Sequence, residues 1–311
     1  MEFFRKPTQF PFMATRKLWY GLSIILMIAS FVSFATRGLN FGIDFTGGVS
    51  VEVSFPRSAN VDAIRTHLEE AGFKEPQVQN FGSSRDIAIR LPPAPAQNGA
   101  AIRAKLEQSL KSIDAGAQIL RLDVVGPQVG SELKKSAVLA LGFTLLLIFI
   151  YIAFRFNTWR LSLGAILAVM HDPILVLGIF SVTQTPFDLA VVAAILAVIG
   201  YSLNDTVVVF DRIRERFHAN RRLVPALALD QSINQTLSRT IMTKVVTAIV
   251  VVALLFLGGA VLRGFSEALM IGIIAGTYSS IYISSAIALD CGLTSEHIFP
   301  TLKKAAADAL P

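Results

Sequence analysis

Six apolar runs, each long enough to cross a lipid bilayer, constrain this 311-residue chain more than any other feature. A membrane-spanning helix needs about 20 mostly apolar residues, and such runs lie at 18–36, 136–154, 161–182, 187–210, 245–262 and 268–289. The composition agrees, because 53% of the residues are hydrophobic and only 16% are charged, against about 25% in a typical soluble protein. We therefore expect a polytopic α-helical membrane protein with six transmembrane helices.

The basic residues beside these runs predict the orientation of the helices, since short cytoplasmic loops are rich in Lys and Arg. Fifteen of them lie in the two tails, in the loop at 155–160 and in the segment 211–244, whereas the opposite short loops hold only Arg263. Both termini should therefore be cytoplasmic. The first run has 19 uncharged residues, too many for the apolar part of a signal peptide, so we interpret it as a permanent anchor.

This orientation divides the chain into five parts. We expect a cytoplasmic N-terminal tail at 1–17, a first transmembrane helix at 18–36, and a periplasmic domain at 37–135. A bundle of five transmembrane helices follows at 136–290 with a cytoplasmic loop at 211–239, and the C-terminal tail at 291–311 is cytoplasmic.

The inserted segment 37–135 has the pattern of a small folded domain. Residues 48–55 alternate as a strand does, and Asn60 is placed to cap a helix with an apolar stripe. Strands at 77–81 and 86–91, a helix at 100–113 and a strand at 118–125 complete the order βαββαβ, which predicts an α+β ferredoxin-like domain. Its 12 basic and 11 acidic residues nearly cancel, so the net charge of +6 is no footprint for nucleic acid.

Asp205 is an ionisable residue well inside the fourth run, where a charge costs about 2.5 to 3.5 kcal/mol or more at the centre of the membrane. Tyr201, Ala197 and Ala193 precede it at intervals of four, so it lies on a face suited to contact with protein. Two interpretations stay open for this carboxylate. It is either a protonation site or half of a permanent ion pair.

Arg239 begins the fifth span at the same end and is the nearest expected counter-charge for Asp205. It can equally extend its guanidinium to the lipid headgroups. His171 and Asp172 lie in the middle of the third span, before Pro173. They are either a proton relay or a pair fixed by its neighbours at a kinked helix.

The residues also limit the kind of chemistry to expect. The single cysteine, Cys291, cannot form an internal disulfide or a cysteine-based zinc site. An intramembrane aspartyl protease would need two facing carboxylates, for which Asp172 and Asp205 are the candidates. We see no catalytic triad, phosphate loop or metal cluster, and we therefore expect no enzyme, no catalytic residues, no metal and no cofactor.

Three stretches carry a family resemblance. They are Asn40-Phe41-Gly42-Ile43-Asp44-Phe45-Thr46-Gly47-Gly48 after the first run, Asn204-Asp205-Thr206-Val207-Val208-Val209-Phe210-Asp211-Arg212-Ile213-Arg214-Glu215 at the end of the fourth, and Gln235-Thr236-Leu237-Ser238-Arg239-Thr240. Together they resemble the SecD/SecF family of the bacterial protein-export machinery, and the resemblance covers nearly the whole chain. Pro173 departs from the aliphatic residue expected there.

The resemblance implies a multi-pass inner-membrane subunit of the resistance-nodulation-division superfamily. Such a subunit would pair with SecD, act with the SecYEG channel and use the proton-motive force to assist a preprotein, with protons as the coupling ion and YajC as a further candidate partner. Asp205 and Arg239 match the family's intramembrane acidic and basic positions. Gly42, Asp44, Thr46, Gly47 and Gly48 match its signature at the junction of membrane and domain. The alternative is one half of a proton-coupled small-molecule transporter of the same superfamily.

Overall fold

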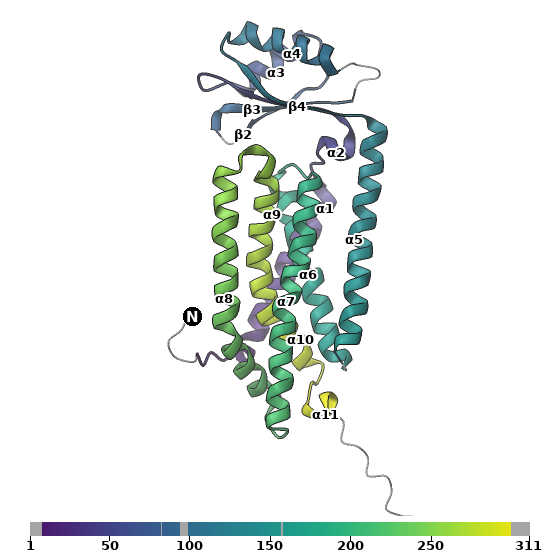
Figure 1. Ribbon diagram of the computed structural model, residues 1–311, viewed down its shortest axis with the longest axis vertical. Coiled ribbons are helices and arrows are strands. Elements are labelled where there is room, and N and C mark those ends of the chain that lie inside the picture. The colour runs from purple at the N-terminus through teal and green to yellow at the C-terminus, as the bar shows by residue number, and fades with distance from the viewer. Residues whose placement is uncertain (1–7, 82, 94–98, 157, 300–311) are drawn as a thin grey trace, which may run out of the picture.

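The computed structural model describes residues 8–81, 83–93, 99–156 and 158–299. A long helical bundle carries a small αβ domain at one end (Figure 1). Six helical segments in the described part are long and apolar enough to cross a membrane, which confirms the predicted architecture. They are α1 (Arg16–Arg37), α5 (Pro127–Arg155), α6 (Trp159–Thr183), α7 (Leu189–Ala219), α8 (Pro225–Leu257), and α9 (Gly259–Tyr278) continued by the π-helical turn η2 (Ser279–Ile283) and α10 (Ser284–Asp290).

Two boundaries differ from those that the sequence predicts. The segment 211–239 is helical except at 220–224, and not a loop, because α7 continues to Ala219 and α8 begins at Pro225. Buried side chains such as Phe217 and Leu229 hold these extensions together, while their other faces are polar. The fifth span ends at Leu257 rather than at 262, because Gly258 and Gly259 form a turn there.

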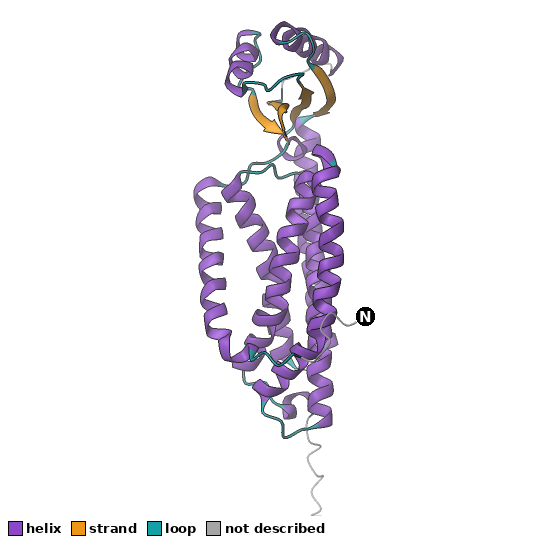
Figure 2. Cartoon of the chain, turned by 90° about the vertical axis from the view of Figure 1, so that its left-hand side faces the viewer, coloured by secondary structure: helices purple, strands orange, loops and turns teal. Residues whose placement is uncertain are grey.

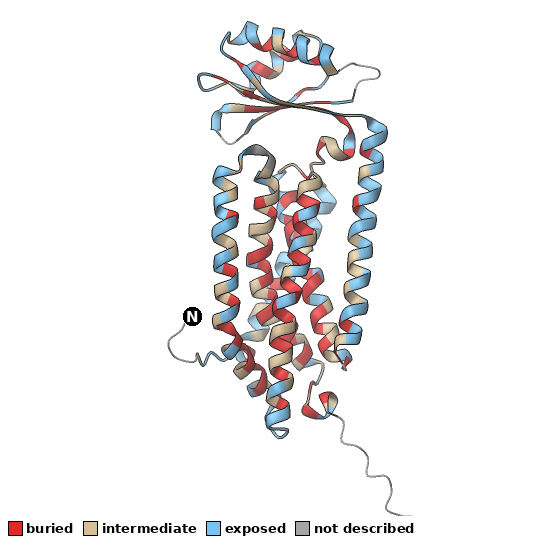
Figure 3. Cartoon of the chain, in the orientation of Figure 1, coloured by how far each residue is buried: buried red, intermediate tan, exposed pale blue. Residues whose placement is uncertain are grey.

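The helices divide into an inner and an outer set. The membrane segments of α6, α7 and α9 are mostly buried, whereas those of α1, α5 and α8 present apolar side chains outward (Figure 3). Close packing of the inner set depends on small residues. A Cβ atom on Gly272 of α9 would lie 2.1 Å from Cγ2 of Val198 on α7, so only glycine fits at this crossing.

The αβ domain contains β1 (Gly48–Ser54), α3 (Val61–Glu70), β2 (Gln77–Phe81), β3 (Ser83–Leu91), α4 (Gly99–Ile113) and β4 (Gln118–Val125). The predicted order βαββαβ is therefore confirmed, and Asn60 caps α3 as expected by accepting from the backbone N–H groups of Asp62 and Ala63.

The four strands pair in the antiparallel order β2-β3-β1-β4, and both helices cover the face of the sheet that points away from the bundle (Figure 2). Apolar side chains between the sheet and the helices, among them Val51, Ile64, Ile89 and Leu106, form a core separate from that of the bundle. The domain thus has its own apolar core. Its other face is turned toward the ends of the membrane helices.

Candidate functional site

Asp205 forms a buried ion pair inside the bundle. Its Oδ2 lies 2.7 Å from Nζ of Lys244 on α8, and both residues are almost fully buried. The Lys244 ammonium also lies 4.2 Å from the centre of the Tyr201 ring. Tyr201 is fixed in turn because its hydroxyl donates to the carbonyl oxygen of Thr243 at 2.8 Å. The two charges are therefore held face to face between α7 and α8.

The predicted pairing of Asp205 with Arg239 is wrong in this structure. Arg239 lies five residues before Lys244 on α8 and is exposed. Five residues turn a helix by about 500°, so the two side chains point in different directions. Hydropathy does not single out Lys244, because this residue immediately precedes the apolar run and resembles the basic residues of a loop. One signal could have found it. Thr240, Lys244 and Val251, all buried, are spaced by four and seven residues along one helical face.

Asp172 has no exposed surface and is the centre of a second buried cluster. Its Oδ2 accepts hydrogen bonds from Oγ of Ser202 at 2.5 Å and from Oγ of Ser279 at 2.9 Å. Nδ1 of His171 lies 3.0 Å from its Oδ1. Nε2 of His171 is buried and has no hydrogen-bond partner among the described residues. Their helix continues through Pro173, and whether the pair relays protons or is fixed by its neighbours stays a prediction.

The two clusters are adjacent along α7. Ser202 contacts Asp172, and Asp205 follows three residues later on a neighbouring part of the helix surface. Ser279 belongs to η2, and π-helical turns of this kind are frequent at functional sites. Each carboxylate has its own partners, whereas an aspartyl protease needs two carboxylates that share a proton. The geometry therefore gives the protease interpretation no support.

The glycine-rich junction folds into the short helix α2 (Ile43–Thr46) between the first membrane helix and β1. Gly42 donates its N–H to the carbonyl oxygen of Phe187 at 2.8 Å, and Thr46 Oγ1 donates to the carbonyl oxygen of Gly42. Gly47 and Gly48 have φ angles of +73° and +124°, which side-chain-bearing residues rarely adopt. The five predicted junction residues therefore lie in α2, at its two caps and at the first residue of β1.

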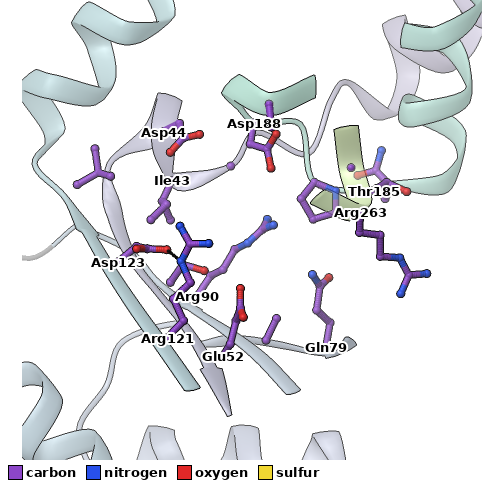
Figure 4. Close-up of a pocket in the computed structure, with 18 of the residues that line it drawn as sticks. Ile43, Asp44, Glu52, Gln79, Arg90, Arg121, Asp123, Thr185, Asp188 and Arg263 are labelled. Carbon is purple, nitrogen blue, oxygen red and sulfur yellow. Dashed lines mark ion pairs between the residues drawn. The ribbon is translucent and has the colours of Figure 1, made fainter. Parts of the chain in front are cut away.

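A polar cavity of about 620 Å³ separates the open face of the sheet from the ends of the membrane helices. Figure 4 shows Arg90, Arg121 and Glu52 extending from the sheet, with the carboxylates of Asp44 and Asp188 on the opposite wall. Burial lowers the pKa of the Arg90 guanidinium, while the charges of Asp188 and Asp44 oppose this change. Burial likewise raises the pKa of the Asp188 carboxyl. Arg90 also reaches across from the sheet, because its Nη1 donates to Oδ1 of Asn40 at 3.4 Å.

Comparison with known proteins decides the family. A model described as "Protein export membrane protein SecD/SecF, C-terminal" matches residues 105–294, and one described as "SecD/SecF GG Motif" matches residues 32–55. The chain belongs to the SecD/SecF family. The GG motif corresponds to the α2 junction, and the longer match includes the Asp205–Lys244 pair and the Asp172 cluster.

Relatives named "Protein translocase subunit SecF" are similar over nearly their whole length. The one from Haemophilus influenzae is 47% identical over 96% of this chain and 91% of its own. The one from Vibrio alginolyticus is 46% identical over 93% and 92%, and the one from Pseudomonas aeruginosa is 43% identical over 96% and 97%. These matches support a role in the Sec protein translocase for this multi-pass membrane protein of the SecD/SecF family.

Two solved SecDF structures have the same fold. The crystal structure from Thermus thermophilus gives a TM-score of 0.83 at 39% identity over 91% of this chain, and a structure described as the super-membrane-facing form gives 0.68 at 38% identity over 93%. This chain spans 39% of each of those chains. The two matches have nearly the same sequence identity and coverage of this chain. The lower TM-score of the second therefore indicates that its matched segments are arranged differently from those of this chain.

Proposed function

We propose that this chain works with SecD as the part of the Sec translocase that uses the proton-motive force to assist preprotein export across the bacterial inner membrane. The observation that carries this proposal is the buried Asp205–Lys244 pair within the apolar spans. A permanent pair of this kind stabilises a fold poorly, because desolvation offsets the attraction between the charges. If the pair opens when Asp205 takes up a proton, the free energy of proton transfer can instead drive a change in helix packing.

Proton uptake at Asp205 would leave Lys244 without its counter-charge and favour a different packing of α7 against α8. One proton crossing a potential of 100 mV delivers about 2.3 kcal/mol, enough to bias a two-state bundle. Ser202, one turn before Asp205 on α7, connects to Asp172 and His171 on α6. We propose that they relay the proton to or from Asp205, with protons as the coupling ion and no cofactor.

The partners and the orientation belong to the same proposal. The outward apolar faces of α1, α5 and α8 suit contact with lipid and with a second bundle, and the similar SecDF chains are longer than this chain by more than a factor of two. We propose SecD as that second bundle, with SecYEG, YajC and the preprotein as further partners. The basic loops and tails favour an orientation with both termini in the cytoplasm and the αβ domain in the periplasm.

Replacing Lys244 with Met tests the role of the pair. The apolar side chain leaves Asp205 without a cation in a dry site, so the carboxyl should stay protonated and stop cycling. We expect export in membrane vesicles containing SecD to lose its dependence on the proton gradient. Protease accessibility checks that the variant inserts normally. If it does, the loss is due to coupling and not to misfolding.

Arg239→Leu is the comparison, because Arg239 is exposed and has no contact with Asp205 in this structure. We expect a weaker effect than that of Lys244→Met. Export lost as completely in Arg239→Leu as in Lys244→Met would show that Arg239 carries the coupling through a contact in the assembled translocase. Normal gradient dependence of Lys244→Met would contradict the proposed role of the pair.

A further inference from the structure

Asp44 joins the glycine-rich junction to the helix that carries the buried ion pair. Its Oδ2 accepts a hydrogen bond at 3.0 Å from the backbone N–H of Leu189, the first residue of α7. We propose that Asp44 is a positioning residue that couples the start of α7 to the αβ domain, so that a shift of α7 moves the sheet. This inference rests on the proposed function, in which Asp205 of the same helix changes charge during export.

The helix itself is suited to carry such a shift. α7 runs without a break from Leu189 to Ala219, and Asp205 lies 16 residues after Leu189. At a rise of 1.5 Å per residue the two positions are about 24 Å apart along the axis. A displacement of the helix near Asp205 therefore reaches its first turn.

The junction binds three backbone groups at and just before the start of α7. Besides the bond to Asp44, the N–H of Phe187 donates to the carbonyl oxygen of Asn40 at 2.8 Å, and the N–H of Gly42 donates to the carbonyl oxygen of Phe187 at 2.8 Å. The Phe45 and Phe187 rings also stack with centres 5.9 Å apart. The residues before α7 and the junction therefore move as one body.

The same junction holds both chain connections of the αβ domain. α2 leads through Gly47 directly into Gly48, the start of the inner strand β1, and Gly48 pairs with Val125 at the end of β4. A Cβ atom on Gly130 of α5 would lie 2.8 Å from the nitrogen of Gly47, so α5 packs tightly against the junction as well. Elsewhere the sheet faces the cavity, and the junction therefore determines the position of the domain.

A capping role alone does not explain Asp44. α7 has its own N-cap residue, Asp188, whose Oδ1 accepts from the N–H of Val191 at 2.9 Å. The bond from Leu189 to Asp44 is an additional one, and it reaches a residue 145 positions earlier in the chain. It ties two parts of the molecule together and is not needed to start the helix.

Proline at position 189 removes this bond from the donor side. Proline lacks an N–H and is well accommodated at the first position of a helix, and Asp188 before it already has the extended backbone that a following proline requires (φ −119°, ψ −176°). Leu189→Ala is the matched control, since it removes the side chain but keeps the N–H. Asp44→Ala removes the acceptor, whereas Asp44→Asn keeps an oxygen that can accept.

The readout is a distance between spin labels in the full-length protein with SecD in vesicles. The labels are placed on cysteines that replace two exposed residues, Lys74 in the αβ domain and Leu257 at the end of α8, with Cys291 changed to Ser. Asp205→Asn imitates the protonated carboxyl. We expect it to shift the label distance in the parent, in Leu189→Ala and in Asp44→Asn.

The shift in label distance should disappear in Leu189→Pro, in Asp44→Ala and in the double variant. Export by the double variant should be no lower than export by either single variant, because both changes remove the same hydrogen bond. The gradient-dependent export of these variants, measured with Asp205 intact, should fall about tenfold, as expected for a lost hydrogen bond to a charged group. A shift that persists in Leu189→Pro or in Asp44→Ala overturns the inference and leaves the proposed function intact. Absence of any shift on Asp205→Asn in the parent also overturns the inference, whereas the proposed function is decided separately by the gradient dependence of export in Lys244→Met.

Discussion

Asp205→Asn will abolish the gradient-dependent part of preprotein export while the chain remains inserted in the membrane. The amide has nearly the shape of the carboxyl but cannot exchange a proton, so the step that opens and closes the pair with Lys244 is lost. Export should then be the same with and without a proton gradient. Vesicles with and without an imposed potential and pH gradient measure the difference directly.

The same variant leaves Lys244 buried without a counter-charge, and breaking one side of a buried ion pair typically destabilises a protein by about 3 to 5 kcal/mol. Asp205→Asn combined with Lys244→Met removes both charges and should restore stability without restoring export. Asp211→Asn is the matched control on α7, because Asp211 pairs with Arg155 in a partly exposed position worth about 0 to 1 kcal/mol. Normal stimulation of export by the proton gradient in Asp205→Asn would contradict the proposed mechanism.

Sequence patterns predict those features that depend on a residue and its near neighbours. The apolar runs locate all six spans, and the strand alternation and the Asn60 cap locate the αβ domain. These signals are local, because a bilayer selects runs of fixed length and a cap bonds within its own first turn. These features can therefore be predicted from the sequence before the fold is known.

Contacts between distant segments lie beyond such patterns. Hydropathy averages over a window and hides one charge at its edge, as at Lys244, and the choice between Lys244 and Arg239 depends on the rotation of α8. The hydroxyl partners of Asp172 come from two other helical segments, and Asp44 reaches Leu189 by tertiary packing. Each of these contacts depends on how the helices pack against one another. The residue pattern of a single segment does not predict that packing.

Gly48→Ser is expected to unfold the αβ domain while the six spans stay inserted. The φ angle of +124° is outside the range of residues with side chains, and a Cβ atom would lie 2.4 Å from the carbonyl oxygen of Leu91 on the neighbouring strand. Backbone strain of about 1 to 3 kcal/mol and overpacking of about 1 to 3 kcal/mol together approach the whole stability of a small domain. Protease added on the side of the membrane where the αβ domain lies should cut the domain of this variant rapidly.

Gly126→Ser is the matched control, since Gly126 directly follows the last strand of the same domain. Its φ is −68°, a Cβ atom there would have no other atom within 4 Å, and serine is favoured at the N-cap of a helix such as α5. We expect this variant to resist protease and to export normally, whereas Gly48→Ser should lose assisted export together with its protease resistance. If Gly48→Ser were cut rapidly yet still supported full gradient-dependent export, the αβ domain would not be the part that acts on the preprotein, and the work of the proton would have to be delivered within the membrane.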